Sequence, residues 1–240
     1  DLMDELEMWD DTMLIVCTDH GFLLGEHDWW AKCVQPFYNE VAHTPLFLWD
    51  PRTGRRAERS QALVQNIDWG PTLMEFFDVP LTEDMQGIPL TESLASDEPR
   101  REAVLYGLHG GQVNVTDGRY VYMRGPASPK NTPLYEYTLM PAHMRHTFDV
   151  AELQDIQLAE PFDFTKGCRT MKIAARGGGW KDIYRFGTML FDLKHDPKQE
   201  HPIDDPEIEA RMIELMVDLM KASDAPPEQF ERLGLDAALD

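Results

Sequence analysis

Two apolar runs near the start of the chain each predict a strand. Residues 13–18 contain β-branched side chains and no polar alternation, which is typical of a strand buried on both faces of a parallel sheet. Residues 45–49 form a second run of this kind and predict another buried strand. Before them, Leu2, Leu6 and Trp9 have the spacing of an apolar helix face. A helix followed by a strand is half of a βαβ unit, so we expect the chain to be the C-terminal portion of a larger protein.

A longer helix is predicted over residues 66–79. Asp68 is suited to cap this helix, and Pro71 falls in its first turn, where a missing N–H is tolerated. After it the pattern changes, with a boundary expected at residues 100–103. We therefore expect residues 1–100 to form the end of an α/β sheet domain.

Beyond this boundary the pattern predicts a small α+β domain over residues 101–240. Residues 117–118, Asp-Gly, are a strong hairpin signal. Asp205 as cap and Pro206 at the first position predict a long helix near the C-terminus. We expect an antiparallel sheet followed by this helix, whereas residues 125–180 show only weak periodicity and their structure stays open. The short β-like runs are residues 103–108, 112–116, 120–124 and 188–193.

The composition excludes some classes of partner. A formal net charge of −21 argues against nucleic acid and anionic membranes, which would repel the chain. No apolar run approaches the roughly 18 residues of a membrane helix. Cys17, Cys33 and Cys168 are an odd number without CxxC spacing, so we expect reduced thiols, with Cys17 in a buried strand. This cysteine usage favours a soluble, cytoplasmic protein slightly, but the compartment stays open.

The first predicted strand ends on Asp19, His20 and Gly21. Ligands of open α/β sheets bind outside the carboxyl ends of the strands, so an acid and an imidazole released there are suited to hold a cation. Neighbouring strand residues face opposite ways, so both side chains can reach one ion only where the backbone leaves strand geometry. A hydrogen-bonded turn is the alternative interpretation. Residues 25–27, Gly-Glu-His, together with Lys32, favour metal binding.

The spacing D-H-G-x(3)-G-E-H-x(4)-K over residues 19–32 resembles the metal-binding segment of the sulfatase family, within the alkaline-phosphatase-like superfamily. Iduronate sulfatases and bacterial sulfatases are the most similar in style. The resemblance implies the C-terminal part of a sulfatase-like α/β catalytic domain over residues 1–100 and a small α+β subdomain over residues 101–240. It continues through residues 41–46, 67–73, 116–120 and 189–197.

The resemblance also implies roles for single residues. The family equivalents of Asp19 and His20 ligate a divalent cation, usually Ca²⁺, and Mg²⁺ or Mn²⁺ would also suit such a site. The other ligands are carboxylates from an earlier strand. Lys32 matches a lysine that contacts the sulfate group, where an ammonium would offset charge on the leaving group. His27 and His43 are further catalytic candidates, each equally compatible with a structural role. His109 is a candidate to line the site from the second domain.

The chain lacks the family's nucleophile segment. Sulfatases use a formylglycine made within C/S-x-P-x-R, and neither Cys33 nor Cys168 stands in such a segment. The resemblance therefore implies the C-terminal part of a metal-dependent hydrolase of small-molecule sulfate monoesters, inactive without a missing N-terminal half. The alternatives are phosphate or phosphonate ester hydrolysis by the same architecture, and a truncated non-catalytic binding module. The identity of the substrate and the oligomeric state, a homo-oligomer included, stay open.

Overall fold

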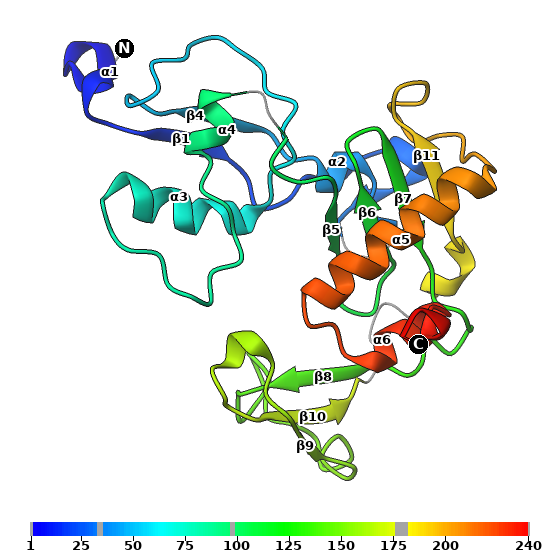
Figure 1. Cartoon of the computed structure of the whole chain (residues 1–240). Coiled ribbons are helices and arrows are strands. Elements are labelled where there is room, and N and C mark those ends of the chain that lie inside the picture. The colour runs from blue at the N-terminus through cyan, green and yellow to red at the C-terminus, as the bar shows by residue number, and fades with distance from the viewer. Residues whose placement is uncertain (1, 33–35, 97–98, 176–181, 240) are drawn as a thin grey trace.

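The computed structural model describes residues 2–32, 36–96, 99–175 and 182–239 (Figure 1). Much of the N-terminal region, residues 2–32 and 36–96, stands beside a four-stranded sheet covered by a long helix, and a separate three-stranded sheet lies below both in this view. Within the described ranges, none of the helices combines the length and apolar character needed to cross a bilayer. The N-terminal region contains α1 (Leu2–Glu5), β1 (Leu14–Cys17), β2 (Leu23–Leu24), β3 (Trp30–Ala31), α2 (Asn39–Ala42), β4 (Leu46–Trp49), α3 (Trp69–Phe76) and α4 (Thr91–Ala95).

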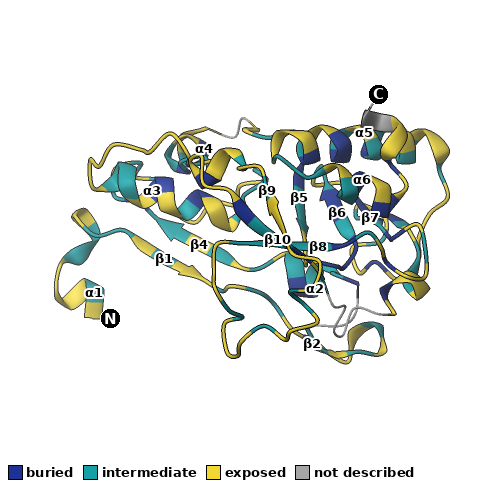
Figure 2. Ribbon diagram, turned by 90° about the horizontal axis from the view of Figure 1, so that it is seen from below, coloured by how far each residue is buried: buried dark blue, intermediate teal, exposed yellow. Residues whose placement is uncertain are grey.

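The two predicted strands of this region form, but the prediction that they are buried in a parallel sheet is wrong. β1 pairs with β4 in antiparallel orientation, with Val16 opposite Phe47. Val16 is 51% exposed and Phe47 is 67% exposed, and Cys17 is exposed as well. Figure 2 shows both strands mostly in the colours of exposed and intermediate residues. In the part of the chain that the structure describes, these strands pair only with each other. An apolar run indicates a preference for burial, but it does not specify which element covers the strand.

The helix predicted from Leu2 to Trp9 is interrupted. α1 ends at Glu5, Glu7 adopts a left-handed conformation with φ 54°, and a 3₁₀ turn follows over Met8–Asp10. A helix of two turns has too few backbone hydrogen bonds to persist without packing. Trp9 instead packs edge-on against Trp49, with ring centroids 5.8 Å apart.

The helix predicted over residues 66–79 forms as a 3₁₀ turn, Asn66–Asp68, followed directly by α3. Asp68 was expected to cap this helix, but its side chain forms no capping hydrogen bond with α3. Its fully buried carboxylate accepts hydrogen bonds from the backbone N–H of Gln65 and of Ile88, both at 2.8 Å. It also pairs with Arg101, at 2.5 and 2.8 Å, so this acid connects three segments of the chain.

The predicted antiparallel sheet and C-terminal helix are confirmed. The sheet has the order β11-β7-β6-β5, with β5 (Val104–Gly107), β6 (Val113–Thr116), β7 (Tyr120–Arg124) and β11 (Met189–Asp192). Helix α5 (Pro206–Ala222) begins as expected, because Asp205 accepts from the N–H groups of Glu207 and Ile208. Its methionine stripe, which includes Met212 and Met216, packs on one face of the sheet with Tyr122.

The opposite face of this sheet packs on the N-terminal region. Side chains alternate along β7, so that Val121 and Met123 face away from α5 and join Phe191 in a second core cluster. Tyr38, just before α2, packs on this cluster. The sheet therefore has α5 on one face and residues that precede α2 on the other.

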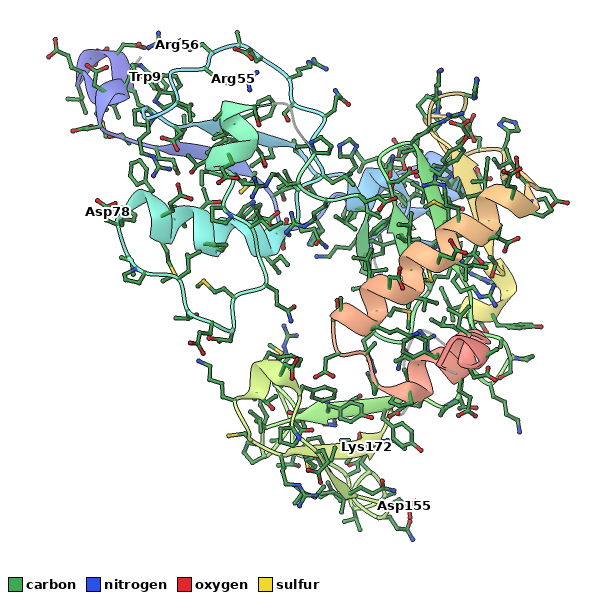
Figure 3. All side chains as sticks on the ribbon, in the orientation of Figure 1. Trp9, Arg55, Arg56, Asp78, Asp155 and Lys172 are labelled. Atoms are coloured by element: carbon green, nitrogen blue, oxygen red, sulfur yellow. The ribbon has the colours of Figure 1, made fainter. Side chains whose placement is uncertain are left out.

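Residues 125–180, whose structure the sequence left open, form an insertion. It contains the three-stranded sheet of order β8-β10-β9. Its strands are β8 (Tyr135–Thr138), β9 (Gln157–Ala159) and β10 (Thr170–Ala174), and the last helix of the chain is α6 (Pro227–Leu233). Lys172 of β10, labelled in Figure 3, pairs with Glu228 of α6 at 2.7 Å. Tyr137 also donates to Glu228, so one acid on α6 anchors the three-stranded sheet.

Candidate functional site

The backbone leaves strand geometry directly after β1, at Thr18, Asp19 and His20. The carboxylate of Asp19 accepts from the backbone N–H of His20 at 3.0 Å and from the hydroxyl of Thr18 at 3.3 Å. Desolvation is the largest single influence and opposes ionisation, but His20 and these hydrogen bonds together outweigh it, so the pKa of Asp19 lies below its usual value. The Asp19 side chain, 81% exposed, is thus held as an ionised acid at the end of β1.

Asp19 and His20 present two ligand atoms close together. Oδ2 of Asp19 lies 3.3 Å from Nε2 of His20. Nδ1 of His20 lies 2.9 Å from the carbonyl oxygen of Gly21, which can only accept, so Nδ1 carries a proton, and in the neutral ring Nε2 then offers its lone pair. A carboxylate oxygen and an imidazole nitrogen are both ligands of divalent cations. Their separation allows Oδ2 of Asp19 and Nε2 of His20 to contact one ion.

Lys32 belongs to the same group of side chains, because its Nζ contacts Nε2 of His20. The structure thus brings together three of the predicted site residues: Asp19, His20 and Lys32. Among the described residues, Asp19 and His20 have no third His, Cys, Asp or Glu side chain close enough to complete a group of three metal ligands.

Gly21 is required for a close backbone approach rather than for a turn. Its N–H donates to the carbonyl of Val41 at 2.9 Å, and a Cβ at this position would lie 1.8 Å from the carbonyl oxygen of Glu40. The segment that carries α2 is therefore packed directly against the end of β1.

His27 faces α2 instead of Asp19. Its ring stacks on Tyr38, with centroids 3.6 Å apart and planes 6° apart, and its Nε2 lies 3.4 Å from Oε2 of Glu40. Both atoms are buried, and neither has a hydrogen-bond partner of good geometry in the described part of the chain. Glu40 was not identified from the sequence, since nothing in its spacing links it to a histidine 13 positions earlier.

The remaining candidates lie elsewhere. His43 is exposed at the end of α2. His109 lies in the loop between β5 and β6, where its Nε2 is 2.9 Å from the carbonyl oxygen of Tyr135. Cys33 is outside the described residues, whereas Cys17 and Cys168 are free, as expected for reduced thiols. Asp196, which is half-buried, and the exposed Glu200 and His201 form a group after β11 that the sequence analysis did not identify.

Comparison with known proteins gives matches to sulfatases and to their superfamily, both in sequence and in fold. A sequence profile described as "N-sulphoglucosamine sulphohydrolase, C-terminal" matches residues 25–159. An N-acetylglucosamine-6-O-sulfatase of Bacteroides thetaiotaomicron is 30% identical over 95 residues, which cover 40% of this chain and 17% of that protein. A multifunctional alkaline phosphatase superfamily protein of Trinickia caryophylli is 32% identical over 99 residues, 40% of this chain and 19% of that protein.

The fold is similar to that of a solved protein in complex with its substrate D-glucosamine-2-N,6-O-disulfate, with a TM-score of 0.59 and 18% identity. That match covers 91% of this chain and 36% of the other. The chain thus spans little more than a third of this structure, and the matched segments span less than a fifth of the two curated relatives.

Proposed function

Because this chain belongs to the sulfatase family, matching its N-sulphoglucosamine sulphohydrolase C-terminal region, we propose that it supplies part of the catalytic site of a sulfate monoester hydrolase. The observation that supports this most is the convergence of Asp19, His20 and Lys32 after β1. Two ligand atoms for a cation and one ammonium are the groups that hydrolysis of an anionic ester requires in one place.

Asp19 and His20 would hold the divalent cation, through Oδ2 and Nε2 respectively. When bound, Ca²⁺, Mg²⁺ or Mn²⁺ would supply a positive charge that polarises the ester oxygens. Carboxylate oxygen suits all three ions, and a single imidazole among oxygen ligands leaves room for Mg²⁺ or Mn²⁺ as well as Ca²⁺. The further ligands and the formylglycine segment, which this sequence does not contain, would come from other polypeptide.

Lys32 would donate from its ammonium to the sulfate ester, offsetting the charge that develops on the leaving oxygen. His27 and His43 remain proposed catalytic residues with different support. His27 is enclosed between Tyr38 and Glu40, which would fix the orientation of its ring, whereas His43 is exposed beside the same helix.

Hydrolysis of phosphate or phosphonate esters is the second candidate function. It is favoured by the similarity to the Trinickia caryophylli protein, whose name describes a multifunctional member of the alkaline phosphatase superfamily. An acid, an imidazole and an ammonium would serve either ester, since both are tetrahedral oxyanions.

The test is to measure rates on an aryl sulfate, an aryl phosphodiester and an aryl phosphonate, with the enzyme that contains this chain and its nucleophile segment. We expect the sulfate to react fastest, chelation by EDTA to abolish the rate, and Lys32→Ala to lower kcat about 100-fold or more. Lys166→Ala is the matched control, because Lys166 is 67% exposed and pairs with Asp84 on the surface. Full activity of the Asp19→Asn and Lys32→Ala variants would refute the proposed site.

A further inference from the structure

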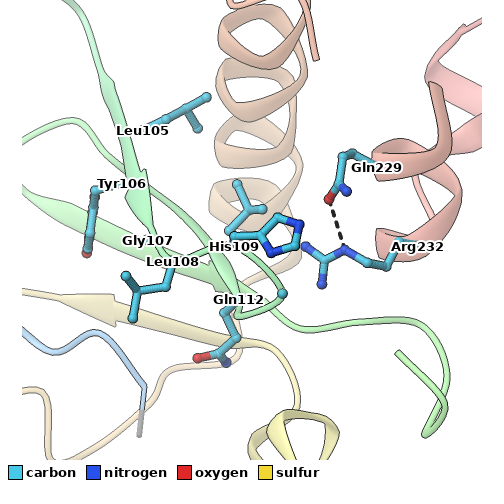
Figure 4. Close-up of a pocket in the computed structure, with 10 residues that line it drawn as sticks. Leu105, Tyr106, Gly107, Leu108, His109, Gln112, Gln229 and Arg232 are labelled. Carbon is cyan, nitrogen blue, oxygen red and sulfur yellow. Dashed lines mark hydrogen bonds between the residues drawn. The ribbon is translucent and has the colours of Figure 1, made fainter. Parts of the chain in front are cut away.

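A pocket of about 280 Å³ lies at the loop end of the β5–β6 hairpin, beside α6 (Figure 4). The hairpin loop contributes Leu108, His109 and Gln112, and α6 contributes Gln229 and Arg232. Figure 4 shows the guanidinium of Arg232 directed from α6 toward His109. None of these residues belongs to the group formed by Asp19, His20 and Lys32.

Arg232 is a buried cation without a carboxylate partner. Arg232 is only 2% exposed. Its Nε donates to Gln229 at 2.9 Å, and its Nη1 donates to the carbonyl of Gly111 at 3.0 Å and to Asn131 at 2.9 Å. All three acceptors are neutral, and no acid among the described residues forms an ion pair with Arg232. Burial lowers the pKa of this guanidinium to about 10, which leaves it charged at neutral pH.

The hydrogen bonds of Arg232 leave one side of the guanidinium unused. Nη2 carries two N–H groups, and neither has an acceptor in the part of the chain that the structure describes. A buried charge without a counter-charge is unfavourable, and an oxyanion is a ligand suited to the N–H groups of a guanidinium.

We propose that this pocket binds a small oxyanion, a sulfate or carboxylate group, through Nη2 of Arg232. The anion supplies the counter-charge that the protein does not. This binding site is separate from the proposed catalytic site and does not depend on it.

The experiment is to titrate the purified protein with sodium sulfate and, separately, with sodium acetate, while following the side-chain N–H signals of its arginines by NMR. Sodium chloride at equal ionic strength is the control for screening. We expect saturable shifts of the Arg232 signal with sulfate, acetate or both, and the stronger binder identifies the preferred anion. No saturable shift with either anion would overturn the proposal.

Variants exclude binding elsewhere. Arg232→Lys keeps the charge but lacks the two N–H groups of Nη2, and we expect at least tenfold weaker binding. Leu108→Trp adds bulk to the lining of the pocket and replaces none of the hydrogen-bond partners of Arg232, so it tests the pocket even where the first variant fails to fold. Lys32→Ala and Arg169→Gln, the latter removing a surface arginine paired with Glu160, should leave the saturable shift of the Arg232 signal unchanged. Unchanged binding in Leu108→Trp, or its loss in Lys32→Ala, would contradict the site.

Discussion

Nζ of Lys32 contacts Nε2 of His20, the nitrogen that is proposed to bind the metal ion. The opposite nitrogen, Nδ1, is engaged with the carbonyl of Gly21 at 2.9 Å, so Nε2 is the acceptor of this ring. An ammonium and a divalent cation cannot share one lone pair. Binding of a cation at His20 would therefore release Lys32, which would then be available to contact an anionic ester.

The first prediction follows from this competition. Replacing Lys32 by Met removes a competing hydrogen bond, whose net value is about 1 kcal/mol, and a repelling charge. We expect Lys32→Met to bind a divalent ion roughly fivefold more tightly than the wild type. Relaxation of the His20 ring protons during titration with Mn²⁺ measures this affinity, even for weak binding. Weaker binding in Lys32→Met would show that the lysine supports the metal site instead of competing with it.

Gly21 provides a second prediction. A Cβ on Gly21 would lie 1.8 Å from the carbonyl oxygen of Glu40, so Gly21→Ala must separate the end of β1 from α2. We expect a loss of about 1–3 kcal/mol in the free energy of unfolding, measured with urea. Gly70→Ala is the matched control: only Met85 lies near its added Cβ, at 4.0 Å, and alanine favours helix α3. Equal stability of the two variants would contradict the close approach described for Gly21.

Asp192 provides a prediction on pH. The guanidinium of Arg119, at 2.9 Å, together with the imidazole of His195 and the N–H of Lys194, holds the pKa of Asp192 well below its usual range. A carboxyl whose pKa is lower in the folded state stabilises the fold above its unfolded pKa of about 3.9, and this stabilisation is lost as the pH falls toward the folded value. Asp192→Asn should therefore be less stable than the wild type at pH 7, with a smaller difference at pH 3.

Urea denaturation of both proteins at these two pH values measures the effect. Asp155→Asn is the control, since Asp155 is an exposed residue of the insertion (Figure 3). A difference between wild type and Asp192→Asn that stays constant with pH would show that the loss comes from packing and not from charge.

The sequence predicted those elements whose signals are local. Asp205 and Pro206 specify the start of α5 through backbone rules that act within one helical turn, and the structure has the same start. The burial of β1 was predicted wrongly, because the exposure of Val16 depends on what covers the strand and not on its own composition. The stack of His27 on Tyr38 and the buried Arg232 depend on contacts between distant segments, which no periodicity contains.

The last prediction concerns the ion pair that connects α3 to the segment before β5. Asp68 is fully buried and its partner Arg101 is only 12% exposed at the side chain. Removing the arginine leaves a buried charge with only backbone N–H donors, so Arg101→Met should lower the free energy of unfolding by about 3–5 kcal/mol.

The neighbouring Arg100 is the matched control, because it pairs with Glu92 on the surface, where the side chains are 38% and 66% exposed. Arg100→Met should change stability by less than about 1 kcal/mol. Urea denaturation compares the two variants, and a double variant, Asp68→Asn with Arg101→Met, should recover part of the loss. A loss in Arg101→Met no larger than that in Arg100→Met would mean that this ion pair does not hold the two segments together.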